Sequence, residues 1–75
     1  MNYNVNASFA DNLKSFVGVT VTVTLNSGQS FTGIVKEVGD HLLHLEQLQG
    51  KEFYDALIRI EDISAIDARF RKTAR

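Results

Sequence analysis

Two histidines and one arginine in the sequence have side chains that can contact a nucleic acid. His41 and His44 are close together in the chain, and Arg59 follows further along. An arginine guanidinium donates hydrogen bonds to a base or a phosphate, or stacks on a base, and a histidine ring stacks and makes single hydrogen bonds. Each side chain also has a simpler reading. Arg59 would form an ion pair with a nearby carboxylate, and both histidines would be merely exposed on a turn and a strand.

The same residue types give no sign of a metal or catalytic site. The chain has no cysteine and only two histidines, too few for an ordinary structural zinc site. The i, i+3 spacing of His41 and His44 points them to opposite faces of an extended chain. No phosphate-binding loop occurs, and nothing in the sequence arranges Ser64, His44 and Asp40 as nucleophile, base and acid. We therefore predict no enzymatic activity, no metal and no cofactor.

Charge is distributed unevenly along the chain. Residues 1–68 carry four basic and nine acidic side chains, a net charge of −5, whereas residues 69–75 carry four basic ones. A short basic tail on an acidic body either contacts phosphates or stays hydrated. The tail charges are those of Arg69, Arg71, Lys72 and Arg75.

The elements that would position these residues begin with a short helix. Apolar residues at i, i+4, i+7 and i+8 form one helical face, which we expect to cap the core. Asn6 or Ser8 is available as the N-cap, and Gly18 as the residue after the C-terminal end. The face consists of Phe9, Leu13, Phe16 and Val17.

Alternation of apolar and polar residues then predicts five strands joined by short turns. In the second strand, Phe31 and Val35 would share one face, and Ile34 and Val38 the other. Gly33 interrupts this strand, which indicates a bend or a close backbone approach. The third strand would turn its leucines, 43 and 45, to the core. The predicted strands are 19–25, 30–38, 43–46, 52–60 and 63–70.

The last two predicted strands are apolar and would lie at the edges of a partly open barrel. Unpaired apolar edges favour association with another chain, and a domain of 75 residues buries too little surface to be very stable alone. We therefore expect a homo-oligomer. Phe53 and Tyr54, at the start of the fourth strand, are expected in an interface or the core rather than stacked on bases.

The chain reads as one domain over residues 8–70, with a flexible segment over 1–7 and a basic tail over 71–75. No apolar run is long enough to span a membrane. Residues 1–7 lack the features of a signal peptide, so we expect a cytoplasmic location and no membrane partner.

Two segments carry a family resemblance. Residues 21–35 resemble the first motif of Sm, LSm and Hfq-type proteins, Leu-x-x-Gly-x-x-hydrophobic-x-Gly-x-hydrophobic. Residues 58–66 are similar to the second motif, Ile-Arg-Gly followed by polar and hydrophobic residues, with Ile60 at the glycine position. The marked positions of the first motif are Leu25, Gly28, Phe31, Gly33 and Val35.

This resemblance implies a mainly β fold, a short N-terminal helix followed by a strongly bent, five-stranded small barrel of the SH3 type. It also implies a ring of five to eight subunits, most often six or seven, in which the fourth strand of one subunit pairs with the fifth of the next. Single-stranded RNA would bind near the central pore.

The family binds RNA through an Asp-x-x-hydrophobic-Asn segment and the arginine of the second motif. With one inserted residue at Gly39, these positions are Asp40, His44 and Arg59. Without it, the Asn position is Leu43, and His41 lies two residues before. The insertion keeps both leucines of the third strand on the core face, because strand register is set by that parity.

We therefore hypothesise a ring that binds single-stranded RNA through Asp40, His41, His44 and Arg59, with the basic tail on phosphates. The alternative is an Sm-like oligomeric scaffold or protein-interaction module without RNA binding. The missing Asn and Gly of the motifs favour this alternative, as does an acidic body that repels phosphate.

Overall fold

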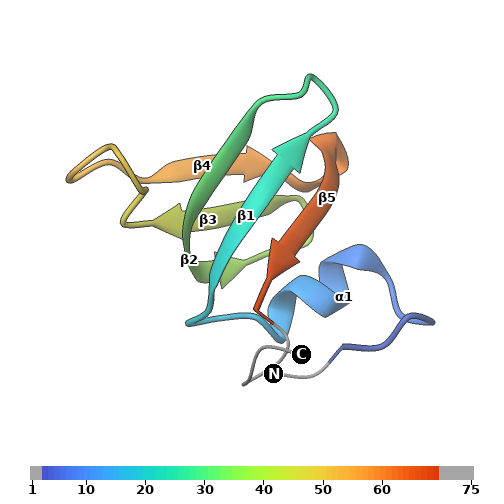
Figure 1. Ribbon diagram of the computed structural model, residues 1–75. Helices are drawn as coiled ribbons and strands as arrows, with labels where there is room; N and C mark the ends of the chain where they lie inside the picture. The colour runs from blue at the N-terminus through green and yellow to red at the C-terminus, as the bar shows by residue number, and fades with distance from the viewer. Residues whose placement is uncertain (1–2, 70–75) are drawn as a thin grey trace.

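The computed structural model describes residues 3–69, and in this range a short helix is followed by five strands, in the predicted order (Figure 1). No helix in this range has the length and apolar character needed to cross a membrane. The elements are α1 (Phe9–Lys14), β1 (Thr20–Leu25), β2 (Ser30–Val38), β3 (Leu42–Glu46), β4 (Ala56–Arg59), a 3₁₀ turn (Ile60–Asp62) and β5 (Ile63–Ala68).

The strands form one antiparallel sheet in the order β4-β3-β2-β1-β5. Figure 1 shows β3 and β4 crossing the direction of β1 and β5, so the sheet curls on itself as a small barrel does. Within the described residues β4 and β5 each pair with a single neighbour. The barrel therefore has two open edges, which the 3₁₀ turn connects.

Two features of β2 produce its bend. A Cβ at Gly33 would lie 2.8 Å from the carbonyl oxygen of Glu46 on β3, so only glycine allows this approach of the two backbones. This confirms the predicted close approach. The pairing of β2 with β3 then shifts between Val35 and Glu37, which makes Lys36 the extra residue of a β-bulge.

The bulge corrects one predicted face of β2. Simple alternation placed Val38 with Ile34 on the face opposite Val35. Beyond the extra residue the alternation reverses, so Val38 pairs with Leu43 and packs against the core. Leu43 and Leu45 are fully buried, as predicted.

The core lies between the curled sheet and α1. Each large apolar side chain that leaves water contributes about 1.5–3 kcal/mol to folding, so this cluster holds the barrel and helix together. The buried residues are Leu13, Phe16, Val21, Val23, Val35, Leu43, Leu45, Leu48, Ile58 and Ile60.

The helix begins where the sequence indicates but ends early. The hydroxyl of Ser8 accepts a hydrogen bond from the Asp11 amide at 3.1 Å, so Ser8, and not Asn6, is the N-cap. α1 ends at Lys14, and turns lead from there to Gly18, whose φ of 89° favours glycine. Gly18 thus ends this turn rather than the helix itself.

Only part of the predicted apolar face packs on the barrel. Leu13 and Phe16 are buried, as expected. The prediction is wrong for Val17 and Phe9, which remain exposed. Val17 lies on the turn after the helix, so it does not continue the helical face.

The segment before α1 is hydrogen-bonded to the helix. The amide of Asn4 donates to the side-chain oxygen of Asn12 at 2.7 Å, and the Ala7 amide donates to the Asn4 carbonyl at 3.0 Å. Flexibility of residues 1–7 and a tail over 71–75 stay predictions. Phe70 and the tail lie outside the described residues.

The fourth strand is shorter than predicted. It begins at Ala56, not Glu52, because residues 47–55 form a loop in which the Leu48 amide donates to the Tyr54 carbonyl at 3.2 Å. Phe53, in this loop, has a φ of 69° and is 97% exposed, and Tyr54 is also exposed. Neither aromatic side chain is in the core.

Candidate nucleic-acid interface

Three of the four candidate residues line one pocket. The β2–β3 turn brings Asp40 and His41 beside Arg59 at the end of β4, around a pocket of about 410 Å³. Two backbone contacts fix this arrangement. The Gly39 amide donates to the Leu42 carbonyl at 2.9 Å and closes the turn, and the Ile60 amide donates to the His41 carbonyl at 2.9 Å. Segments distant in sequence thus converge here because β3 and β4 pair.

Arg59 is ion-paired inside this pocket. Its guanidinium donates a hydrogen bond to the Glu61 carboxylate, and Arg59 Nε lies 3.8 Å from an Asp62 carboxylate oxygen. The hydrogen bond to Glu61 and the two negative charges raise the pKa of Arg59, so the side chain stays charged. It is also 65% exposed. A ligand can therefore reach the guanidinium but must compete with Glu61.

Asp40 is tied to α1. Its carboxylate lies 3.6 Å from Lys14 Nζ, which also lies 3.9 Å from Asp11. The helix thus supplies a positive charge at the rim of the pocket. His41 is exposed, and within residues 3–69 its ring has no hydrogen-bond or ion-pair partner.

His44 faces a neighbouring hollow instead. It lies on the outer face of β3 opposite Leu57, and its Nε2 is 2.9 Å from a carboxylate oxygen of Asp55. This hydrogen bond lowers the pKa of Asp55 below its usual value of 3.8, and the Gln47 amide, 3.3 Å away, adds to the effect. The hollow of about 230 Å³ shares Leu42 with the first pocket. The four candidates therefore occupy two adjacent sites.

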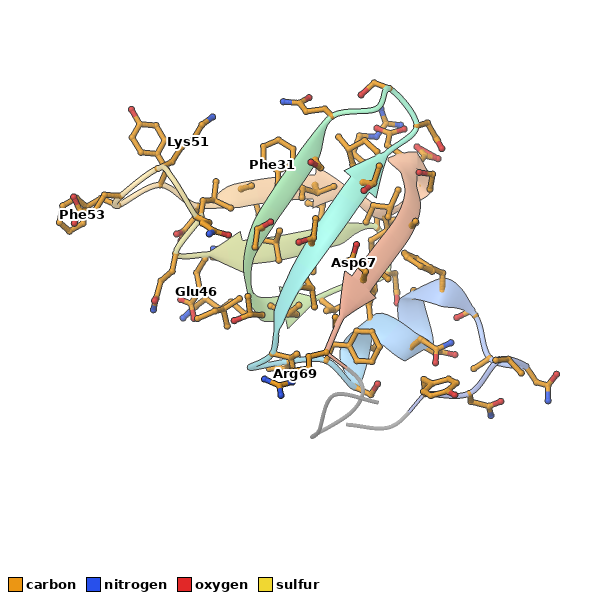
Figure 2. The ribbon with its side chains drawn as sticks, viewed as in Figure 1. Phe31, Glu46, Lys51, Phe53, Asp67 and Arg69 are labelled. Atoms are coloured by element: carbon orange, nitrogen blue, oxygen red, sulfur yellow. The ribbon has the colours of Figure 1, made fainter. Side chains whose placement is uncertain are left out.

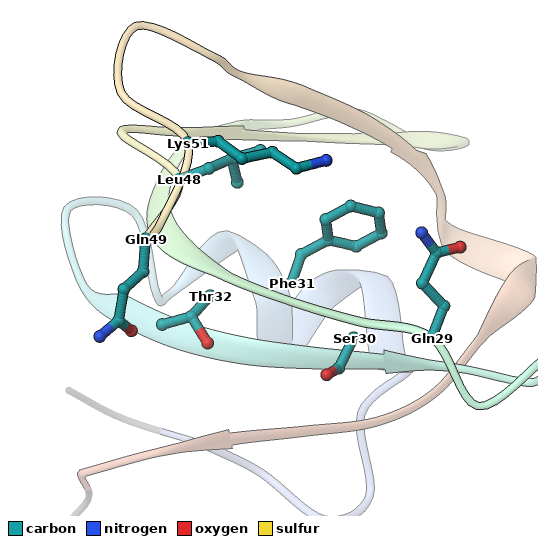
Figure 3. Close-up of a pocket in the computed structure, with 7 residues that line it drawn as sticks. All are labelled: Gln29, Ser30, Phe31, Thr32, Leu48, Gln49 and Lys51. Atoms are coloured by element: carbon teal, nitrogen blue, oxygen red, sulfur yellow. The ribbon is translucent and has the colours of Figure 1, made fainter.

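A further pocket, which sequence reasoning missed, lies between the start of β2 and the loop over residues 47–55. Phe31 and Lys51 form its main walls, with Gln29 and Gln49 at its ends, and its volume is about 270 Å³ (Figure 3). Figure 3 shows the Lys51 side chain extending above the Phe31 ring. Phe31 was assigned to the first motif and Lys51 to a turn, and no sequence signal joins them.

The described part of the chain contains no cluster of three or more histidine, cysteine or acidic side chains that could hold a metal ion. The pocket around Arg59 instead combines the cation of Arg59, the imidazole of His41 and the carboxylate of Asp40. Together they can hold a planar polar group by stacking and by hydrogen bonds.

Comparison with known proteins identifies the fold. No family model and no curated protein matches the sequence. Among solved structures, the chain is similar to the LSm domain of Dm EDC3 (Enhancer of Decapping 3), with a TM-score of 0.62 and 16% sequence identity. The match covers 73% of this chain and 60% of that chain. The protein therefore has the Sm-like fold, a short N-terminal helix followed by five antiparallel strands, as its two motifs predict.

Proposed function

We propose that this protein assembles into a homo-oligomeric ring of five to eight copies, most often six or seven, that binds single-stranded RNA near its centre. The RNA contact would be the pocket of Asp40, His41 and Arg59. The observation that carries the proposal is the convergence of these three residues from two separate segments of an Sm-like barrel. The proposed role is binding rather than catalysis.

The chemistry of each side chain suits one part of a nucleotide. The charged guanidinium of Arg59 would donate to a base edge or a phosphate, and the exposed ring of His41 would stack on the base. Asp40 would accept a hydrogen bond from a base N–H. A second base would stack on His44 in the neighbouring hollow, and the basic tail would contact phosphates.

The ring would form at the open edges of the barrel. β4 and β5 each have one unpaired side in the described chain, and Leu57 on β4 is 71% exposed. Pairing of β4 with β5 of the next copy would satisfy the free backbone groups and cover this leucine. Leu57→Lys would place a charge there, and we expect it to reduce the subunit number in native mass spectrometry.

The RNA contact is tested by fluorescence anisotropy with labelled uridine-rich and adenine-rich oligonucleotides. We expect Arg59→Ala to weaken binding roughly tenfold, the usual effect of losing one good base contact. The matched control is Lys36→Ala, because Lys36 is another exposed, ion-paired cation, 3.7 Å from Glu46, that lies outside the pocket. We expect the control to change affinity less than twofold or so, a purely electrostatic effect.

The RNA proposal is wrong if Arg59→Ala binds RNA as tightly as the unchanged protein while subunit number is the same. It is also wrong if the two alanine variants lose affinity equally, because the loss would then reflect net charge and not the pocket.

A second candidate is an oligomeric scaffold without RNA binding. The pairing of Arg59 with Glu61 and Asp62 favours it, since a phosphate approaching the guanidinium would meet two carboxylates. For this candidate, affinity purification would recover a protein partner whose amount does not change after nuclease treatment.

A further inference from the structure

The loop over residues 47–55 projects from the barrel at the end of the β3–β4 hairpin opposite the candidate RNA pocket. Figure 2 shows Phe53 at the outer tip of this loop, pointing away from the sheet. Its side chain is 97% exposed, the largest exposure among the large apolar residues described. This ring contributes no apolar burial to folding, and with the exposed Tyr54 beside it, it offers aromatic surface that a partner can cover.

The backbone holds Phe53 in place. The Tyr54 amide donates to the Lys51 carbonyl at 3.0 Å, and the Gln49 amide donates to the Thr32 carbonyl on β2 at 2.8 Å. Phe53 itself has a φ of 69°, a conformation that bulky side chains rarely adopt. The loop is therefore a fixed projection that keeps its aromatic ring outside at some conformational cost.

An apolar hollow lies directly beside this ring. It has a volume of about 410 Å³ and is lined by the apolar residues Leu48 and Phe53 together with Gln47, Glu52 and Asp55. A projecting ring and a hollow able to receive one thus lie side by side on the same loop. Such a surface is complementary to a second copy of itself across a two-fold axis.

The charges of the loop fit the same arrangement. Lys51 and Glu52 are exposed and adjacent, and within the part of the chain that the structure describes neither has an ion-pair partner. In the single chain the Lys51 side chain lies over Phe31 (Figure 3), and in a two-fold contact at this loop it would turn toward Glu52 of the other copy. RNA fits less well, because it would bring only negative phosphates to Glu52 and Asp55, whereas a second copy also brings the positive charge of its Lys51.

We propose that two copies of this chain associate loop to loop, with each Phe53 ring entering the hollow over the partner copy's Leu48. Lys51 of each copy pairs with Glu52 of the other. The contact does not use β4, β5 or the Arg59 pocket, so it is independent of the ring and of RNA binding. Where the ring forms, this contact joins two rings and doubles the subunit number.

The contact area is small, so its strength is best measured across a wide concentration range. The experiment is sedimentation equilibrium from roughly 10 µM to 1 mM, the range in which small interfaces associate. We expect the unchanged protein to reach twice the mass of Phe53→Ser, and the variant to associate at least about tenfold more weakly. The matched control is Val5→Ser, because Val5 is also highly exposed and belongs to the segment before α1, which Figure 1 shows far from the loop between β3 and β4.

Charge exchange tests the geometry. Lys51→Glu and Glu52→Lys should each weaken the doubling, because each leaves like charges facing across the axis. The double variant with both changes should restore it, since the pairs are then reversed but complementary.

Equal masses of the unchanged protein and Phe53→Ser at every concentration would overturn the proposal. So would equal effects of Phe53→Ser and Val5→Ser, or a double charge variant no better than the single ones. The ring is scored separately with Leu57→Lys, so failure of the ring leaves the loop contact measurable, and failure of the loop contact leaves the ring measurable.

Discussion

The two ends of the β3–β4 hairpin differ in how far their side chains are already satisfied. At one end, Arg59 and Asp40 line the candidate RNA pocket, and each is paired with a charge of opposite sign. At the other end, the Phe53 side chain is exposed to solvent, and Lys51 has no ion-pair partner within residues 3–69. The same two strands thus support two kinds of surface. The pocket of Arg59 must lose ion pairs when it binds a ligand, whereas Phe53 and Lys51 have few contacts within the chain to lose.

The energetic consequence follows from exposure. An exposed ion pair such as Arg59 with Glu61 is screened by water and contributes little to stability, so a ligand can replace it at small cost. Complete burial of a phenylalanine side chain contributes about 1.5–3 kcal/mol. The charged end is therefore suited to weak exchange with polar ligands, and the aromatic end to a contact driven by loss of apolar surface.

The largest expected effect comes from a core substitution that destabilises the whole β3–β4 hairpin, and with it both surfaces. Leu43 is fully buried on β3, between the two surfaces, so Leu43→Ala should lower the free energy of unfolding by about 2–5 kcal/mol. Leu57→Ala, on the exposed face of the same hairpin, should change it by less than about 0.5 kcal/mol at a low protein concentration, where the proposed ring is dissociated. Urea denaturation followed by circular dichroism measures both. Similar losses in the two variants would contradict the assignment of core and surface faces.

Much of this hairpin could be predicted from the sequence. Alternation placed both leucines of β3 in the core and predicted five strands after a helix, because burial on one face of a strand leaves a period of two. Gly33 was predictable as a close approach, since a glycine inside a strand has few other uses.

The remainder depends on contacts that no local pattern encodes. The bulge at Lys36 reverses the alternation toward Val38, and nothing in residue type marks it. Residues 52–55 contain two adjacent aromatic side chains, a residue type that favours strands, yet the Leu48 to Tyr54 hydrogen bond makes them part of a loop. Arg59 was predicted either to bind RNA or to form an ion pair. The structure has the ion pair, and RNA binding stays a prediction.

A smaller effect is expected on RNA affinity when the ion pair of Arg59 is removed. Glu61→Gln removes the negative charge hydrogen-bonded to Arg59 and should raise RNA affinity by about threefold, because the guanidinium no longer gives up an ion pair. Fluorescence anisotropy at constant salt measures the gain. Glu52→Gln is the control, since it removes one negative charge from the distant loop. If both variants gained equally, net charge and not Arg59 would be responsible.

An effect of similar size concerns stability at the aromatic end. Phe53→Gly should raise the free energy of unfolding by up to about 1 kcal/mol, because glycine adopts a positive φ without steric cost and the exposed ring loses no contact within its own chain. Phe53→Ala is the control, since alanine keeps the steric cost and should give no gain. Thermal unfolding at low protein concentration, where the loop contact is absent, measures both. A loss of stability in the glycine variant would show that the ring packs within its own chain.

The smallest expected effect is a pH dependence of the hydrogen bond that ties the loop to β3. The hydrogen bond from His44 lowers the pKa of Asp55 in the folded protein, so ionised Asp55 adds stability above its usual pKa, and this stability is lost as pH falls through the lowered value. The stability difference between the unchanged protein and Asp55→Asn should therefore be steady near pH 5 and shrink below about pH 4. Urea denaturation across this range measures the difference, and the amide resonance of Gln47 reports the same protonation locally, because that amide donates to Asp55.

The control is a His44→Gln background, in which the Asp55 carboxyl loses its main partner. There Asp55→Asn should lower the free energy of unfolding by less, and the pH at which the difference shrinks should move upward. A difference that stays constant down to pH 3 would mean that the loop is held by its backbone hydrogen bonds alone.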